Sequence, residues 1–160
     1  MFLNIFLLGL TAVTLAGFWL LPGGVIDLRR LAHGRLQVDL RPAYGADTVY
    51  AMLDAYGNRG RVWFGRMLRA DLVFPMLYAA TIWTLAASQS ATHAHPATLL
   101  AQGAGIAAAA FDELENILLL RILSVYPARH AWFARLAGAM TFAKTCGLLM
   151  AVGVLAAGIA

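Results

Sequence analysis

Four polar side chains interrupt one of the most apolar stretches of the chain, at Phe111-Asp112-Glu113-Leu114-Glu115-Asn116. Residues 97–110 before them carry no charge, and residues 117–120 after them are all aliphatic. On a helix, Asp112, Glu115 and Asn116 share one sector of ~100°, whereas Glu113 points away from it. Acids at membrane depth cost several kcal/mol each unless they are paired, hydrated or protonated, and they mark function by default. This cluster is therefore the candidate site around which we organise the chain.

The chain has a single lysine, Lys144, and it lies inside another apolar stretch. It follows Leu136 by about eight residues, or ~12 Å of helix rise. Counted back from Leu123, Asp112 and Glu115 lie at a comparable depth. The sequence therefore predicts an ion pair between Lys144 and the acidic face, with Thr141 on the same stripe as the lysine.

A third group of polar residues begins the apolar stretch over 71–87. Asp71, Pro75 and Tyr78 have the spacing i, i+4, i+7 and so share one helix face. Pro75 frees a backbone carbonyl near Asp71 and can kink the helix. Asp71 belongs either to the site or, with equal weight, to an interfacial ion pair with Arg66 or Arg69.

Small residues lie one to two turns from the acids on the same face, at Gly105, Ala108 and Ala109. They leave volume that either a ligand or a closely packed helix could fill. The opposite face also has small residues, which suit tight helix packing. Both explanations stay open at this point.

Four acids, Asp71, Asp112, Glu113 and Glu115, face one buried cation, so a single ion pair cannot neutralise them. A carboxylic acid kept neutral beside a fixed ammonium supplies a donor, a base and a positive charge, which general acid–base chemistry needs. We expect Asp112, Glu115, Lys144 and Asp71 to act catalytically. The expected substrate contacts are Asn116, Tyr78, Pro75, Gly105 and Thr141.

We expect neither a metal nor a cofactor. Asp71, Asp112 and Glu115 could offer oxygen ligands to Mg²⁺ or Mn²⁺, but Lys144 would oppose the ion. His93 and His95 lack a third ligand. Cys146, the only cysteine, excludes an intrachain disulfide and is expected to be a buried structural thiol.

The composition, 61% apolar and 12% charged, is not that of an ordinary soluble domain. Apolar runs over about 2–21, 71–87, 97–123 and 136–159 approach or exceed the ~20 residues that cross a bilayer. The predicted fold is all-α, an integral membrane four-helix bundle in one domain over 1–160. A connection over 22–70 would carry a cytoplasmic amphipathic helix at 47–57, with Asp47 as N-cap and Gly57 as stop. The alternating residues 36–40 could be extended.

The distribution of charge predicts the topology. Eight of the eleven arginines lie between Arg29 and Arg69, whereas the turn over 88–96 has none. The positive-inside rule then places the connection over 22–70 in the cytoplasm and both termini outside, in a bacterial inner membrane. The net charge of +4 is therefore not a nucleic-acid signal. The arginines near 59–69 are expected to meet lipid phosphates.

The motifs Asp71-x-x-x-Pro75-x-x-Tyr78, Asp112-x-x-Glu115-Asn116 and Lys144 resemble those of an uncharacterised family of small four-span bacterial membrane proteins. The resemblance extends to Asp39, Tyr44, Gly60-Arg61 and Tyr126-Pro127. It indicates which residues matter and implies no activity. In architecture alone, the chain is also loosely similar to the sterol-isomerase and sigma-2-receptor superfamily.

Two functions compete. The first is binding or transformation of an apolar, lipid-like or isoprenoid molecule by acid–base chemistry, of the isomerase or cyclase type. The second is a non-catalytic membrane subunit or assembly factor, in which the polar cluster fixes helix packing and Glu113 contacts a partner protein or a second copy. A proton or ion path ranks last, because the acids do not extend across the membrane.

Overall fold

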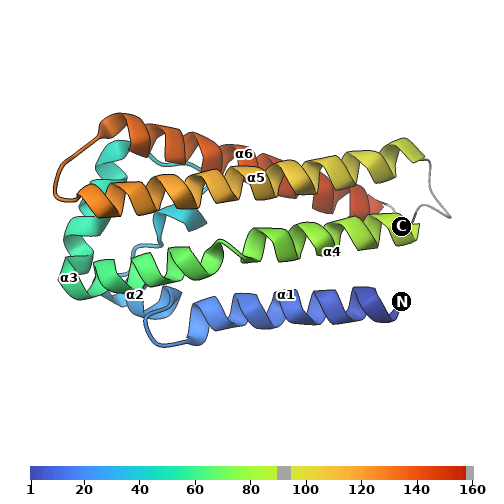
Figure 1. The fold of residues 1–160 in the computed structure, drawn as a ribbon, viewed down its shortest axis with the longest axis horizontal. Helices are drawn as coiled ribbons and strands as arrows, with labels where there is room; N and C mark the ends of the chain where they lie inside the picture. The colour runs from blue at the N-terminus through green and yellow to red at the C-terminus, as the bar shows by residue number, and fades with distance from the viewer. Residues whose placement is uncertain (90–94, 158–160) are drawn as a thin grey trace.

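The computed structural model describes residues 1–89 and 95–157, and in those ranges every regular element is helical. The prediction of an all-α fold is confirmed. The elements are α1 (Phe2–Leu20), α2 (Val25–Leu31), the 3₁₀ helix η1 (Val38–Leu40), α3 (Ala46–Asp71), α4 (Phe74–Gln89), α5 (His95–Val125) and α6 (Ala131–Ala157). Helices α1, α4, α5 and α6 lie alongside one another, and part of α3 crosses one end of them (Figure 1).

Three of the described stretches are long and apolar enough to cross a membrane, namely 2–31, 46–89 and 131–157. Helix α5 is not among them, and Asp112, Glu113, Glu115 and Arg121 interrupt its apolar sequence. That it crosses the bilayer stays a prediction. Helix α1 has no buried residue, and apolar side chains such as Phe2, Ile5 and Val13 are exposed along it. An apolar surface of this kind suits contact with lipid.

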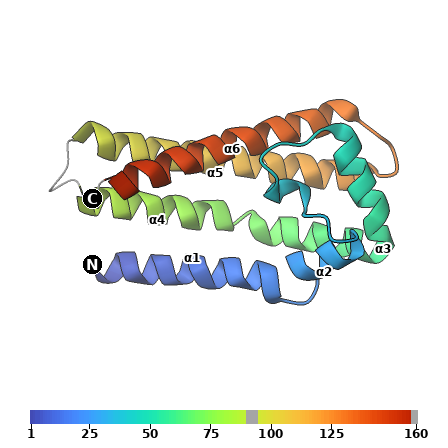
Figure 2. The same cartoon turned by 180° about the vertical axis from the view of Figure 1, so that it is seen from behind.

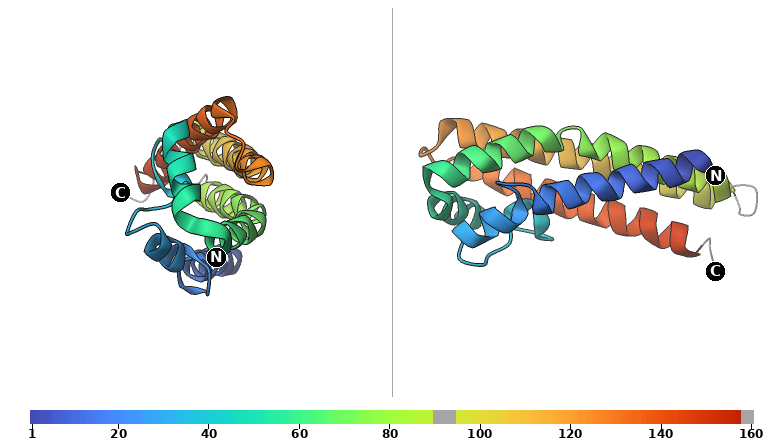
Figure 3. Two further views of the ribbon diagram at one scale, coloured as in Figure 1. Left: turned by 90° about the vertical axis from the view of Figure 1, so that its left-hand side faces the viewer. Right: turned by 90° about the horizontal axis from the view of Figure 1, so that it is seen from below.

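Gly57 divides α3 into two helical segments. Its backbone has φ 59° and ψ −171°, a conformation that costs glycine little. The predicted stop at Gly57 is confirmed, although helix resumes directly after it. The N-cap is Gly45 rather than Asp47, which lies in the first turn. Figure 3 shows the first segment lying across the end of the bundle. The apolar face of this segment, Val49 included, is buried.

The second segment of α3 leads into α4 through a break at residues 72–73. Pro75 is the second residue of α4, where its missing N–H is least costly. The interruption predicted near Asp71 is therefore present. It gives Asp71 the last position of α3, facing the middle of the bundle.

Two apolar cores lie at opposite ends of the bundle, and the polar cluster lies between them. On α5, Ala108 belongs to one core and Leu119 to the other. On α6, Ala151 belongs to the same core as Ala108, and Ala137 belongs to the same core as Leu119. The acids at 112–116 and Lys144 therefore form a polar layer between two apolar ones.

The segment between α2 and α3 turns back into the bundle, as Figure 2 shows. It contains η1, a 3₁₀ helix, so the prediction of an extended segment over 36–40 is wrong. Tyr44 lies directly against α6: a Cβ on Gly138 would approach the Tyr44 carbonyl oxygen to 2.1 Å. Only glycine allows this contact, which brings residues 37–44 to the polar layer.

The first turn of α1 and the last turn of α6 lie at the same end of the bundle (Figure 1). The first segment of α3 lies at the opposite end. Cys146 is exposed on α6, so the prediction of a buried thiol is wrong. Its position on the helix turns it away from the stripe that carries Thr141 and Lys144, both of which are buried.

Candidate functional site

The centre of the site is Lys144, whose ammonium group binds two carboxylates of α5. Its Nζ lies 2.8 Å from Asp112 Oδ1 and 2.6 Å from Glu115 Oε2. The exposed fractions of the three side chains are 11%, 8% and 0%. Asp112 and Glu115 are one helical turn apart, so α5 presents both to the same point of α6. The predicted ion pair is confirmed, and it has two acidic partners.

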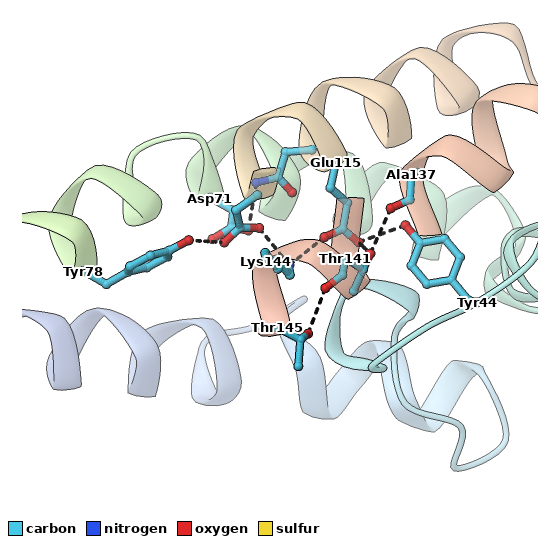
Figure 4. Close-up of polar contacts among 10 residues, drawn as sticks. Tyr44, Asp71, Tyr78, Glu115, Ala137, Thr141, Lys144 and Thr145 are labelled. Carbon is cyan, nitrogen blue, oxygen red and sulfur yellow. Dashed lines mark hydrogen bonds and ion pairs between the residues drawn. The ribbon is translucent and has the colours of Figure 1, made fainter. Parts of the chain in front are cut away.

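Glu115 is held from two further directions. The Tyr44 hydroxyl donates to Glu115 Oε1 at 2.9 Å, and the Thr141 hydroxyl donates to the same oxygen. Burial, together with the negative charge of Glu115, raises the pKa of Tyr44, which keeps this hydroxyl a neutral donor. Figure 4 shows Tyr44 and Tyr78 reaching the cluster from opposite sides. Glu115 is thus fully enclosed by protein groups.

Two hydrogen bonds join α3, α4 and α5 to this network. Tyr78 of α4 donates its hydroxyl proton to Asp112 Oδ2 at 3.2 Å. The Asn116 amide donates to Asp71 Oδ2 at 3.1 Å. Asp71 thus contacts the α5 cluster, which favours the site explanation over the interfacial ion pair.

A cavity of about 500 Å³ opens beside the network. Its polar end is formed by Asp39, Asp71, Tyr78, Asp112 and Lys144. Its walls are mainly apolar and come from α1, α3, α4 and α6; they include Leu15, Phe18, Trp19, Met67, Phe74 and Leu148. A cavity with apolar walls and a few convergent polar groups is the usual form of a small-molecule site.

Negative charge dominates the polar end. Asp39, Asp71, Asp112 and Glu115 surround the Lys144 ammonium group, and Arg41 is a second cation that lines the cavity. Asp39 was not predicted as a site residue. Burial raises the pKa of Asp39 to about 7, against the lowering effect of Lys144, while Glu115 and Asp71 raise it further. Asp39 therefore changes its protonation close to neutral pH.

Of the residues predicted to contact a substrate, only Tyr78 lines the cavity. Asn116 donates a hydrogen bond to Asp71, and Thr141 donates one to Glu115, but neither residue lines the cavity. Pro75 is buried at the start of α4. Gly105 packs against α4, where a Cβ would approach Ile82 to 2.8 Å. The close-packing explanation of the small residues is thus the correct one at Gly105.

Three contributors were missed as site residues: Asp39, Gln37 and Tyr44. All belong to the segment before α3, whose sequence has no helical periodicity to orient it. The only signal was the resemblance that included Asp39 and Tyr44. Physical reasoning on spacing could not place this segment at the depth of Glu115.

Among the described residues, no three His, Cys, Asp or Glu side chains are grouped so that they could hold a metal ion. Lys144 lies between Asp112 and Glu115, two of the three acids considered as ligands. His93 lies outside the described residues, as does the side chain of His95.

Comparison with known proteins gave no family model, no similar curated protein and no similar solved structure that matches the chain.

Proposed function

We propose that this protein is a multi-pass protein of a bacterial cytoplasmic membrane that binds an apolar, lipid-like or isoprenoid molecule and acts on it by acid–base chemistry. The observation that carries the proposal is the cavity, whose apolar walls end at a buried group of acids and one lysine. Buried ionisable groups of this kind are costly to keep and are found mainly at functional sites.

The orientation follows from charge. Eight arginines lie between Arg29 and Arg69, in or near the elements at one end of the bundle, while α1 begins and α6 ends at the other. The positive-inside rule then puts the arginine-rich end in the cytoplasm and both termini outside. Membrane lipids are the expected surroundings, and an apolar small molecule is the expected ligand.

The ligand enters the cavity between α1 and α6. Leu15 and Phe18 of α1 and Leu148 of α6 line the cavity on two sides. Helix α1 packs along α4 and has no buried residue, so it is the least enclosed helix of the bundle. An entrance on this side would open toward lipid rather than water.

The polar groups divide into those that face the ligand and those that hold them. Asp71, Asp112, Tyr78 and Lys144 line the cavity and can exchange a proton with a bound molecule. In an isomerisation, a carboxylate such as Asp71 would take a proton from carbon, and a second group would return one elsewhere. Lys144 would stabilise the negative charge that develops in between. Glu115 does not line the cavity and acts as a positioning residue for Lys144.

The test is mass spectrometry of the molecules that co-purify with the protein in mild detergent, for wild type and Asp112→Asn. Asp54→Asn is the matched control, because Asp54 is an exposed carboxylate paired with Arg129. We expect a defined apolar molecule whose amount or structure changes in Asp112→Asn and not in Asp54→Asn. Bulk phospholipid alone in all three samples would count against the proposal.

A second function has its own support. The bonds among Lys144, Glu115, Tyr44 and Thr141 join α5, α6 and the connection, as a purely structural network would. Glu113 points away from it, and its Oε1 is buried without a partner among the described residues. The rest of the Glu113 side chain is partly exposed, so a membrane-protein partner or a second copy of the chain could contact it there. In that case Asp112→Asn would mainly lower thermal stability, and a partner protein would co-purify through Glu113.

A further inference from the structure

Two buried oxygen atoms at the polar end of the cavity lack a hydrogen-bond donor among the described residues. They are Gln37 Oε1 and Asp39 Oδ1, and both residues line the cavity. Gln37 is fully buried, and the exposed fraction of Asp39 is 9%. Buried acceptors without a partner cost about 1–3 kcal/mol each, so they are rare in stable proteins.

The orientation of the Gln37 amide is fixed by its neighbour. Its Nε2 lies 3.5 Å from the sulfur of Met67. A thioether sulfur can accept a hydrogen bond but cannot donate one, so the nitrogen must face Met67. The oxygen is therefore the atom left without a partner, and the site offers an acceptor there.

No donor of the described residues is hydrogen-bonded to either of these two oxygens. Lys144 Nζ is engaged with Asp112 and Glu115, and the Tyr78 hydroxyl donates to Asp112. The Tyr44 hydroxyl donates to Glu115. The third N–H of Lys144 and the unpartnered Tyr56 hydroxyl are not hydrogen-bonded to Gln37 Oε1 or Asp39 Oδ1. A donor on a molecule in the cavity can therefore pair with these two oxygens.

We propose that the polar end of the bound molecule is a hydrogen-bond donor, a hydroxyl or a protonated amine, which donates to Asp39 and Gln37. The inference rests on the proposed function and names the chemical class of its ligand. The apolar body of the molecule lies along Leu15, Phe18, Phe74 and Leu148. A carboxylate or phosphate end is disfavoured, because the three acids Asp39, Asp71 and Asp112 outnumber the two cations of the lining, Arg41 and Lys144, and the lysine is already paired.

The experiment compares probes that share one chain and differ only in the head group. The purified full-length protein in mild detergent is titrated with dodecanol, dodecylamine, dodecyl methyl ether, dodecyltrimethylammonium and dodecanoate, and binding is followed by native mass spectrometry. We expect the alcohol or the amine to bind at least about tenfold more tightly than the methyl ether, which corresponds to about 1.4 kcal/mol. The tighter of the two identifies the head group as hydroxyl or ammonium.

Variants connect the preference to the two oxygens. Asp39→Asn should reduce the preference for the amine over the methyl ether. Gln37→Leu should reduce the preference of both the alcohol and the amine over the methyl ether, whereas Asp54→Asn should leave both preferences unchanged. If a variant fails to fold, the wild-type comparisons of the alcohol with the methyl ether and of the amine with dodecyltrimethylammonium still decide the question, because they need no substitution.

Three results would overturn the inference. Equal binding of dodecanol, dodecylamine and the methyl ether would mean that water serves the two oxygens, while the proposed apolar site would stand. Equal binding of dodecylamine and dodecyltrimethylammonium, both tighter than the alcohol, would mean that charge alone is recognised. If no probe binds, the proposed function fails together with the inference.

Discussion

Removal of the Lys144 ammonium is the most direct perturbation of the polar layer. In Lys144→Met, Asp112 and Glu115 lose a partner at 2.8 and 2.6 Å, and both side chains are at most 8% exposed. Breaking a buried pair in this way costs about 3–5 kcal/mol, because an uncompensated charge remains. For a chain of this length, each kcal/mol corresponds to about 2–4 °C in melting temperature. We therefore expect a decrease of between about 6 and 20 °C.

The assay is thermal unfolding of the purified protein in mild detergent. Arg129→Met is the matched control, since its pair with Asp54 also measures 2.8 Å but is exposed. Exposed pairs contribute less than about 1 kcal/mol, so the control should shift by a few degrees at most. The triple variant Asp112→Asn, Glu115→Gln, Lys144→Met should recover much of the loss, because no unpaired charge is left. If Lys144→Met melts no lower than Arg129→Met, the ion pairs are not the groups that hold the layer together.

Three further results are expected, each followed by melting temperature in the same detergent. Tyr44→Phe removes one donor to the Glu115 carboxylate and should cost about 1.5–3 kcal/mol; a smaller effect would mean that water replaces the hydroxyl. Gly138→Ala should destabilise the protein clearly more than Gly103→Ala, because a Cβ at 138 would collide with the Tyr44 carbonyl oxygen at 2.1 Å whereas a Cβ at 103 meets nothing within 4 Å. Equal effects would show that Tyr44 does not pack against Gly138. Asp39 should make stability depend on pH, because its pKa is about 7 in the folded protein and 3.8 in the unfolded chain. Between these pH values the folded state binds one proton more than the unfolded state, so the free energy of unfolding falls as pH rises. The melting temperature of Asp39→Asn minus that of wild type should therefore grow from pH 5 to pH 8, and a constant difference would contradict the burial of this carboxyl group.

The core of the site could be predicted from the sequence because helices have a fixed geometry. A period of 3.6 residues placed Asp112 and Glu115 on one face, and a rise of about 1.5 Å per residue brought Lys144 to the same depth. Those two constants are sufficient for the α5–α6 ion pairs. Tyr78 followed from the same reasoning on α4.

The rest depends on contacts that no local period encodes. Asp39 and Tyr44 reach the site because a connection without helical repeat folds back onto α6, and Glu115 lies 71 positions after Tyr44. The side on which the cavity opens was also beyond sequence reasoning. Glycine at 105 indicated room, but Ile82 fills it, and the empty volume lies toward α1 instead.

The contact between Tyr44 and Gly138 also has a consequence for synthesis. The ribosome completes residues 37–44 long before Gly138 and Lys144 exist, so the segment lacks its partners on α6 while α5 is being made. During that interval Asp39 also lacks the Lys144 ammonium group, which favours its charged form in the complete structure. Arrival of α6 supplies the glycine seat and the ammonium group together. The site is thus completed only when α6 is made, and a chain released before α6 would lack the ammonium group at its centre.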